Sequence, residues 1–354
     1  MQSINANCMN RHLAIPLHRA MHASAVVALT GPRRAGKATL ARREFPAHTY
    51  VHLANTADRL AARENPAAFL ASLRGRAIID DAHRAPELLA VLATGQGSSL
   101  LLLAPIRLPL AHQLHLFPPS LAEREQRPAP SLEALARYPQ LRQALPALRV
   151  ESPGAQATRD EASLELDARM LIGLHDADRF LRFVEIAGAA TGGVADQSAW
   201  ARQCRVTHTT ISRWLDALER AFYLIQPRAF DDASGRRLVK RRKVHFLDPA
   251  WVPAGARFAT WALAEIVKNL AHAGQPLHFS HWLTATGLGT SLIVEGAAGP
   301  ISVTITRLPS APPAAVAAAA QWCALAPHHA ACIVTAGQVS VVRQKIVTLP
   351  WWAL

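Results

Sequence analysis

The stretch SAVVALTGPRRAGKATLARREF, residues 24–45, decides the fold of the first part of this chain. An apolar run at residues 24–30 predicts a strand, and a glycine loop and a helical segment follow it. The loop fits the spacing GxxxxGK in the strand–loop–helix context that a phosphate-binding P-loop requires. Backbone N–H groups of such a loop surround a phosphate, and its lysine reaches the β- and γ-phosphates. The sequence therefore predicts an ATP or ADP site made of Gly31, Pro32, Arg33, Arg34, Ala35, Gly36, Lys37, Ala38 and Thr39.

Strands and helices alternate through the next sixty residues. Short apolar runs at residues 49–53, 76–80 and 99–104 predict buried strands, and residues 66–73 and 85–93 predict helices. This alternation is typical of a parallel sheet covered by helices on both faces.

The strand at residues 76–80 ends in two acidic residues. Asp80 is expected to hold the water shell of a Mg²⁺ ion, and Asp81 stands where ATPases of this kind place the carboxylate that polarises the attacking water. The alternative is an acidic pair at the surface after a core strand.

The composition is that of a globular chain with a basic excess. The 354 residues are 50% apolar and carry a formal charge of +13, which favours polyanionic partners such as nucleic acid or an acidic membrane surface. Four cysteines without metal-site spacing argue against zinc and against a disulfide framework. Because no apolar run reaches about 18 residues, we expect a soluble, cytoplasmic protein that does not bind membranes.

Residues 198–224 have helix-turn-helix character, with a short helix, a polar turn and a second helix that carries Arg213. Basic and apolar residues alternate over residues 236–247, as in the wing of a winged helix. We predict that this region contacts DNA without sequence preference, although a solvated hairpin accounts for the pattern equally well. The candidate contacts are Arg213, Arg236, Arg237, Lys240, Arg241, Arg242 and Lys243. The last hundred residues again mix strands with helices and predict a second α/β unit.

Taken in order, these segments resemble one known family. GPRRAGKAT, AIIDDAHRAPEL and LAHQLHLFPPSLAE are similar to the P-loop, the Walker B strand and the following motif of prokaryotic AAA-type ATPases that carry a C-terminal domain of unknown function. Later segments, from ELDAR at residues 165–169 to the ending LPWWAL, extend the resemblance over about residues 20–354. It implies a P-loop ATPase domain at residues 1–122, a helical linker at 123–175, a winged helix-turn-helix at 176–252 and a restriction-endonuclease-like module at 253–354.

The departures from this family fall on catalytic positions. Ala38 replaces the threonine that binds Mg²⁺, the sensor expected after residue 104 is missing, and Gln113 replaces an arginine. In the nuclease-like module the expected metal ligands and lysine are replaced by Ala259, Ser291, Thr304 and Thr306. The resemblance therefore implies a degenerate member with weak or absent ATP hydrolysis and no nuclease activity.

Two functions remain open at this point. The first is a nucleotide-binding protein, favoured because Lys37 is retained. The second is a DNA-binding or interaction scaffold that no longer uses nucleotide. The sequence does not decide between a homo-oligomer and a complex with another protein.

Overall fold

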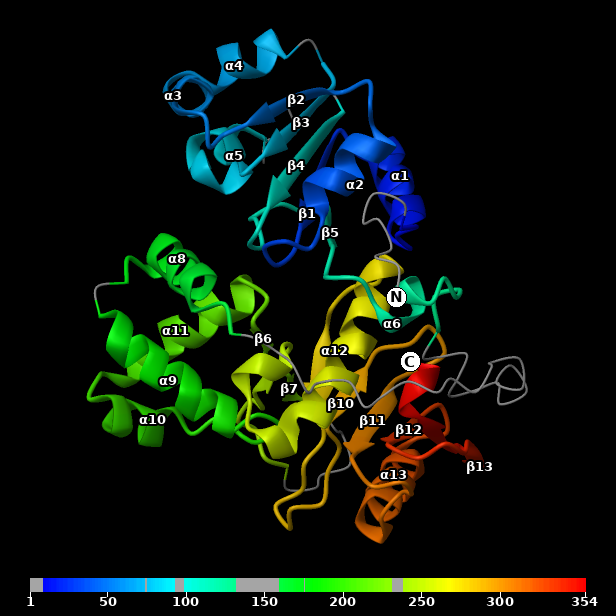
Figure 1. Ribbon diagram of the computed structural model, residues 1–354. Helices are drawn as coiled ribbons and strands as arrows, with labels where there is room; N and C mark the ends of the chain where they lie inside the picture. Colours follow the sequence, from blue (N-terminus) through cyan, green and yellow to red (C-terminus); the bar gives the residue numbers. More distant parts are fainter. Residues whose placement is uncertain (1–8, 74, 93–98, 132–158, 175, 231–237) are drawn as a thin grey trace, which may run out of the picture. The chain divides into compact units, whose positions relative to one another are not determined.

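The computed structural model describes residues 9–73, 75–92, 99–131, 159–174, 176–230 and 238–354. The chain divides into two compact units, which are described separately (Figure 1). Unit 1 contains Met1–Ala129, Arg220–Phe222 and Lys268–Pro276, and unit 2 contains the rest of the chain. The division into four domains at residues 122, 175 and 252 stays a prediction.

Unit 1 is built on a five-stranded, entirely parallel sheet in the order β2-β3-β4-β1-β5. Its strands are β1 (Val26–Thr30), β2 (Thr49–His52), β3 (Ala77–Asp80), β4 (Leu100–Ala104) and β5 (Gln113–His115). The first four confirm the strands predicted from the apolar runs. The sequence patterns did not indicate β5, which is short, partly buried and pairs with the end of β1.

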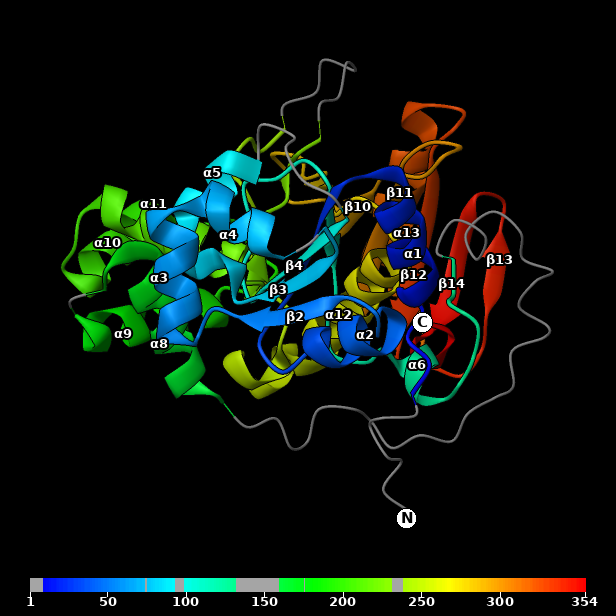
Figure 2. The ribbon, with the colours of Figure 1, turned by 90° about the horizontal axis from the view of Figure 1, so that it is seen from above.

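The helices of unit 1 include three that the sequence patterns indicated: the one after the glycine loop and those predicted at residues 66–73 and 85–93. They are α1 (Ala14–Ala23), α2 (Lys37–Glu44), α3 (Thr56–Glu64), α4 (Pro66–Ser72), α5 (Pro86–Leu92) and α6 (Leu121–Arg124), with the short 3₁₀ helix η2 at Ala82–Arg84. The side chains of Asn55 and Asn65 cap α3 and α4 by accepting backbone N–H groups. In Figure 2 these two helices lie close together beside the sheet. Apolar residues of α1, α2, β1 and β4 form one buried core cluster.

The first part of unit 2 is helical. It contains α8 (Glu161–Ile172), α9 (Ala177–Ala189), α10 (Gln197–Cys204) and α11 (His208–Arg220) up to Glu219, followed by the two-stranded antiparallel sheet of β6 (Leu224–Ile225) and β8 (His245–Phe246). Two helices occupy most of residues 161–189, because Gly173 adopts a left-handed conformation that ends α8 and Asp176 caps α9. Phe180, Phe183 and Trp214 pack together in the core of this part.

The second part of unit 2 is a seven-stranded mixed sheet in the order β13-β14-β12-β11-β10-β9-β7. Its strands are β7 (Arg228–Ala229), β9 (Phe279–His281), β10 (Leu292–Val294), β11 (Ile301–Thr306), β12 (Ala330–Thr335), β13 (Val341–Arg343) and β14 (Ile346–Pro350). Its helices are α12 (Arg257–His272), whose last residues from Lys268 belong to unit 1, α13 (Pro313–Leu325) and the 3₁₀ turns Pro249–Trp251, Ala254–Ala256 and Trp351–Ala353. The structure thus confirms a mixed α/β protein with a parallel sheet. A winged helix and a nuclease-like module stay predictions.

Candidate functional site

The predicted P-loop lies where the chain order of the parallel sheet reverses. β1 lies between β4 and β5, so its carboxyl end is flanked by strands that come much later in the chain. Ligands of open parallel sheets bind at the carboxyl ends of strands near such reversals. The loop of residues 31–36 leaves β1 at this end and enters α2 at Lys37.

Two glycines allow the backbone conformation of the loop. Gly31 has φ +148°, and a Cβ atom placed there would lie 1.9 Å from the carbonyl oxygen of Leu116. Gly36 has φ +91° and caps α2 in the left-handed region. Arg34 also has positive φ, at +61°, which is uncommon for a residue with a side chain. The backbone therefore needs glycine at the two positions where the P-loop motif has it.

The Lys37 side chain folds back over the loop. Its Nζ donates hydrogen bonds of 2.8 Å to the carbonyl oxygens of Gly31 and Pro32, so the ammonium group is held inside the loop. At the start of α2 the next side chains are Ala38, which has no hydroxyl, and Thr39, which is exposed. The residues predicted for phosphate binding are thus brought together, whereas neither of the side chains at positions 38 and 39 replaces the missing hydroxyl inside the loop.

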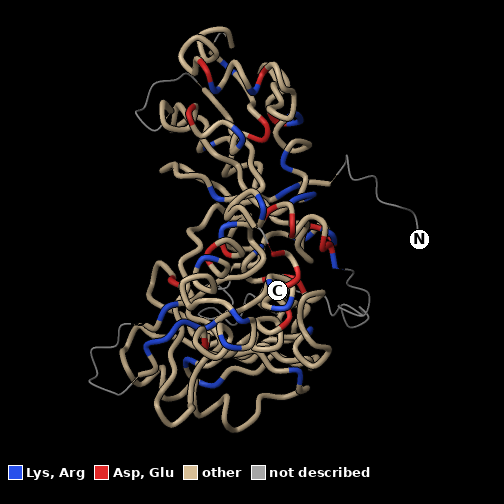
Figure 3. The backbone as a smooth tube through the Cα atoms, turned by 90° about the vertical axis from the view of Figure 1, so that its left-hand side faces the viewer, with Lys and Arg blue, Asp and Glu red and all other residues tan. Residues whose placement is uncertain are grey.

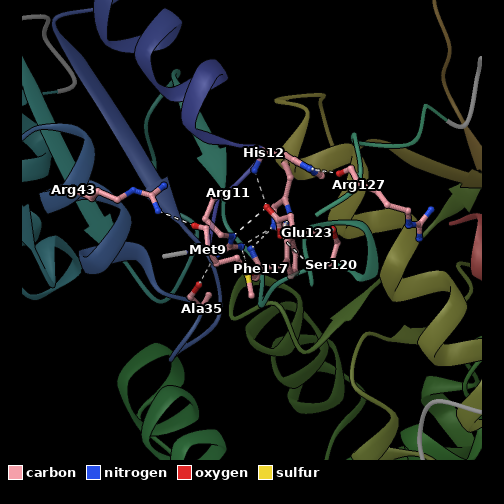
Figure 4. Close-up of polar contacts among 10 residues, drawn as sticks. Met9, Arg11, His12, Ala35, Arg43, Phe117, Ser120, Glu123 and Arg127 are labelled. Atoms are coloured by element: carbon pink, nitrogen blue, oxygen red, sulfur yellow. Dashed lines mark hydrogen bonds and ion pairs between the residues drawn. The ribbon is translucent and has the colours of Figure 1, made fainter. Parts of the chain in front are cut away.

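The Arg11 side chain donates a hydrogen bond to the backbone of the loop, a role that the sequence patterns did not indicate. Its Nη1 donates to the carbonyl oxygen of Ala35 at 3.0 Å, and its Nη2 donates to that of Phe117 at 2.6 Å. Its Nε pairs with Glu123 Oε1 at 3.1 Å (Figure 4). The side chains of Arg11 and Glu123 are 8% and 0% exposed, so the ion pair is buried.

Glu123 accepts four hydrogen bonds or ion-pair contacts at the start of α6. Oε1 also accepts the backbone N–H of His12 at 2.8 Å, and Oε2 accepts that of Ser120 at 2.9 Å. The Nδ1 atom of His272 lies 3.1 Å from Oε2. Burial alone would raise the pKa of Glu123, but the hydrogen bond from His272 and the charge of Arg11 hold this pKa well below its ordinary value.

The histidine in this cluster contacts both the backbone and the carboxylate. His272 Nε2 accepts the backbone N–H of Phe117 at 3.1 Å, so a neutral ring would carry its proton on Nδ1, the atom that lies 3.1 Å from Glu123 Oε2. Burial lowers the pKa of His272 despite the nearby carboxylate. Arg11 and Glu123 are therefore the ion pair that contacts the loop, and His272 lies against the carboxylate of Glu123.

The two predicted acidic residues lie at the end of β3. Asp80 accepts the Tyr50 hydroxyl at 2.5 Å through Oδ2 and the backbone N–H of Asp81 through Oδ1. Burial and the hydrogen bond to Asp80 raise the pKa of Tyr50 to about 12, which keeps this hydroxyl a donor at neutral pH. Asp81 has φ +56° and accepts from Arg84 Nε at 2.9 Å. Both residues are partly buried, and their roles at a nucleotide site stay a prediction, as does the alternative of an acidic pair at the surface.

Two histidines beside these carboxylates were not predicted. His52 is the last residue of β2 and pairs in register with Asp80, while His83 lies in the 3₁₀ turn after β3. Burial lowers the pKa of His83 to about 4, against the attraction of Asp81, so its ring is neutral at pH 7. The strand alternation could have found His52, because parallel neighbours end at one edge of the sheet.

Gln113 stands at the position where the resembled family has an arginine, and its side chain forms hydrogen bonds within its own turn. Its Oε1 accepts the backbone N–H of Leu108 at 3.0 Å, and its Nε2 donates to the carbonyl oxygens of Leu108 and Leu110 at 2.6 and 2.8 Å. The side chain therefore holds the segment before β5 and carries no charge for phosphate.

The basic residues predicted to contact DNA do not form one exposed run. Lys243 is only 7% exposed, and its Nζ donates to the carbonyl oxygen of Thr290 at 2.7 Å, so its assignment to an exposed hairpin is wrong. Burial lowers the pKa of Lys243 to about 8. Lys240 and Arg241 are exposed, and Arg242 is half-buried.

The remaining DNA candidates give no further support. Arg213 is exposed on α11, but its Nη2 lies 3.4 Å from the carbonyl oxygen of Ile172 within unit 2. Arg236 and Arg237 lie outside the described residues. Figure 3 shows lysine and arginine spread along the chain with acidic residues among them. DNA contact therefore stays a prediction.

The positions expected for nuclease ligands lie on α12, beside β10 and on β11. Ser291 Oγ is 3.4 Å from the backbone N of Ile305, and Ala259, Thr304 and Thr306 offer no carboxylate. Within the described ranges, the group of three metal-ligating side chains that converges is His52, Asp80 and Asp81 in unit 1.

One family comparison concerns unit 2. Residues 158–260 match the sequence model of a domain of unknown function, DUF8612. This match begins before α8 and ends within α12, and it covers less than half of the chain.

Two curated relatives are similar over a limited stretch. An uncharacterized protein of Mycobacterium tuberculosis and one of Mycobacterium bovis are each 43% identical over 94 residues. The match covers 24% of this chain and 20% of each relative, so the chain spans about a fifth of the length of the curated relatives it matches.

Solved structures give only distant likenesses. The Walker-type ATPase of Pyrococcus abyssi has a TM-score of 0.34 and 11% identity, over 68% of this chain and 93% of that one. A signal transduction ATPase with numerous domains and a tetratricopeptide repeat sensor, from Pyrococcus horikoshii, has a TM-score of 0.24 and 14% identity, over 77% and 50%. Both likenesses are too distant to decide the fold, which rests on the strand order and the loop of this chain. None of the helices in the described part of the chain has the length and apolar character needed to cross a membrane.

Proposed function

We propose that unit 1 binds ATP or ADP at residues 31–39 and hydrolyses ATP slowly or not at all. The observation that carries this proposal is the loop between β1 and α2, with its two glycines at positive φ and the Lys37 ammonium inside it. Phosphate oxygens would take the place of the carbonyls of Gly31 and Pro32 as acceptors for Lys37. The backbone N–H groups at the start of α2 would contribute the partial positive charge of the helix terminus.

Weak hydrolysis follows from the side chains around the loop. A bound Mg²⁺ would bridge phosphate oxygens and neutralise developing charge. Asp80 would hold its water shell, but Ala38 contributes no hydroxyl and Gln113 no positive charge. Asp81 Oδ2 accepts a hydrogen bond from Arg84 Nε at 2.9 Å, which occupies one of the positions where this carboxylate could accept from a water molecule. Contacts of these kinds are each worth roughly several-fold to 10³ in rate.

Calorimetric titration of the full chain with ATP and ADP, with and without Mg²⁺, tests nucleotide binding. Lys37→Ala should abolish the heat of binding, whereas Lys240→Ala, which removes an exposed lysine of unit 2, should not change it. Absence of heat at millimolar nucleotide on folded protein would overturn the proposal, and so would unchanged binding by Lys37→Ala.

Hydrolysis has its own test. Turnover of roughly 1 per second or more would contradict the weak catalysis proposed for this site. Ala38→Thr restores the hydroxyl at the start of α2 and should make nucleotide binding more dependent on Mg²⁺.

We further propose that the chain is a degenerate relative of the AAA-type family, with a winged helix-turn-helix at residues 176–252 and a non-cleaving nuclease-like module at 253–354. The succession of α10, α11 and the β6–β8 pair supports the first, and the mixed sheet with α12 and α13 supports the second. A plasmid-nicking assay with Mn²⁺ in which cleavage follows the purified protein would contradict the loss of nuclease activity.

A further inference from the structure

The strand β13 lies at the outer edge of the seven-stranded sheet of unit 2. It stands at one end of the strand order, and within the described part of the chain it pairs with β14 alone (Figure 1). Its residues, Val341–Arg343, are all exposed. The outward backbone N–H and C=O groups of an edge strand are available to a further strand. β13 therefore offers a place where an extended segment can add to the sheet.

Apolar side chains gather beside this edge. Eight large apolar side chains are exposed among the described residues, and four of them lie on β13 or on the segments next to it: Leu308, Val339, Val341 and Val342. The backbone N–H of Ala336 donates to the carbonyl oxygen of Leu308 at 3.0 Å, which places the loop before α13 along the segment that leads into β13. Exposed apolar groups that gather in this way are typical of an interaction surface.

A pocket of about 370 Å³ opens on one face of the hairpin formed by β13 and β14. β13 lines it with Val341 and Arg343, β14 with Ile346 and Thr348, and α13 with Val316. Val341 pairs with Thr348 and Arg343 with Ile346, so alternate residues of both strands face this pocket. A strand added at the edge would direct every second side chain to the same face.

The charge of this surface favours an acidic partner. The Arg343 side chain is exposed at the pocket, and within the described part of the chain it forms no ion pair. Residues 296–354 contain the cations Arg307, Arg343 and Lys345 and no aspartate or glutamate. A second copy of the chain, which has a formal charge of +13, would bring like charges together. An acidic segment is complementary to the surface instead.

We propose that β13 binds an extended acidic segment of a partner protein, which adds to the sheet as a further strand. Apolar side chains of that segment would contact Val341 and enter the pocket, and a carboxylate would pair with Arg343. Backbone hydrogen bonds to β13 would supply affinity, while the pocket and Arg343 would supply specificity. All of these residues belong to unit 2, so the interaction does not depend on the proposed nucleotide binding in unit 1.

A peptide in which glutamate and valine alternate tests this proposal. The peptide carries fluorescein, and the full chain is titrated into it while fluorescence anisotropy is measured. We expect saturable binding. A peptide of the same composition with its glutamates and valines in separate blocks should bind at least about ten-fold more weakly, because it cannot present one kind of side chain to each face of the sheet.

Substitutions at the edge separate strand addition from general attraction by a basic protein. Arg343→Glu should weaken binding of the alternating peptide at least about ten-fold and improve binding of a peptide in which lysine and valine alternate. The matched control is Arg241→Glu, which makes the same change of charge at an exposed residue before β8 and should leave both affinities nearly unchanged.

Three results would overturn the proposal: no saturable binding of the alternating peptide up to millimolar concentration, equal binding of the block peptide, or equal losses in Arg343→Glu and Arg241→Glu. Sedimentation of the full chain tests the competing occupant, because a dimer that Val341→Asp dissociates would place a second copy at this edge and would also overturn it. Arg343 is exposed, so its variant is expected to fold, and a thermal unfolding curve like that of the wild type checks this.

Discussion

Replacing Glu123 by glutamine should destabilise unit 1 strongly, although the side chain keeps its shape. The substitution puts an amide NH₂ group among donors from Arg11, His12, Ser120 and His272. At least one donor then faces another donor, and the Arg11 guanidinium, 8% exposed, loses its counter-charge. Removing one partner of a buried ion pair costs about 3–5 kcal/mol.

This loss is large enough to measure by thermal unfolding. For domains of 150–250 residues, 1 kcal/mol shifts the Tm by about 2–4 °C, so Glu123→Gln should lower the Tm by roughly 6–20 °C. The matched control is Glu87→Gln, which breaks the pair of Glu87 with Arg63, whose side chains are 40% and 48% exposed. An exposed pair contributes about 0–1 kcal/mol, so this control should move the Tm by at most a few degrees.

A double-mutant cycle completes the test. Arg11→Met removes the charge that Glu123→Gln leaves unpaired, so the double variant should be more stable than the sum of the two single losses implies. The reasoning is refuted if Glu123→Gln and Glu87→Gln have the same Tm, or if the two changes at Arg11 and Glu123 are additive.

The same carboxylate should also set the acid limit of stability. The pKa of Glu123 is lowered in the folded chain, so the carboxylate stabilises the fold above its unfolded pKa of about 4.3, and this stabilisation is lost as the pH falls below that value. The free energy of unfolding should therefore decrease less with acidification for Glu123→Gln than for the wild type. Gly31→Ala should abolish nucleotide binding or folding, because its Cβ would lie 1.9 Å from a backbone oxygen, whereas Gly255→Ala, with nothing within 4 Å, should be neutral in calorimetry and in unfolding. If the basic segment binds DNA, gel shifts at low salt should weaken when Lys240 and Arg241 become alanine; a shift unchanged by both substitutions would exclude this segment as the contact.

Local sequence patterns were sufficient for the first four strands of unit 1. Short apolar runs between polar segments are typical of buried strands, and their alternation with helices predicts parallel pairing. β5 could not be predicted in this way because residues 113–115 are only partly buried, so pairing with β1 and not an apolar run makes them a strand. α1 was not predicted because histidine and arginine interrupt its apolar residues, of which only Leu17 is buried.

The candidate site was predictable where its residues are adjacent in sequence and not where they are remote. The loop at residues 31–39 and the pair Asp80 and Asp81 follow directly from single strands. The nearness of His52 to Asp80 depends on the register of two strands, which pairs residues that are 28 positions apart. The burial of Lys243 could not be predicted because its acceptor, the carbonyl of Thr290, is 47 positions away in the chain.

The central position of β1 has a consequence for how unit 1 opens in solution. β1 is hydrogen-bonded to β4 on one side and to β5 on the other, and its residues after Val26 are buried. Amide hydrogens of such a strand exchange with solvent only through the larger opening events, whereas β2 at the edge of the sheet can fray on its own. Deuterium uptake should therefore be slowest along the strand that leads into the loop, so the base of that loop keeps its position while the edge bearing His52 opens and closes.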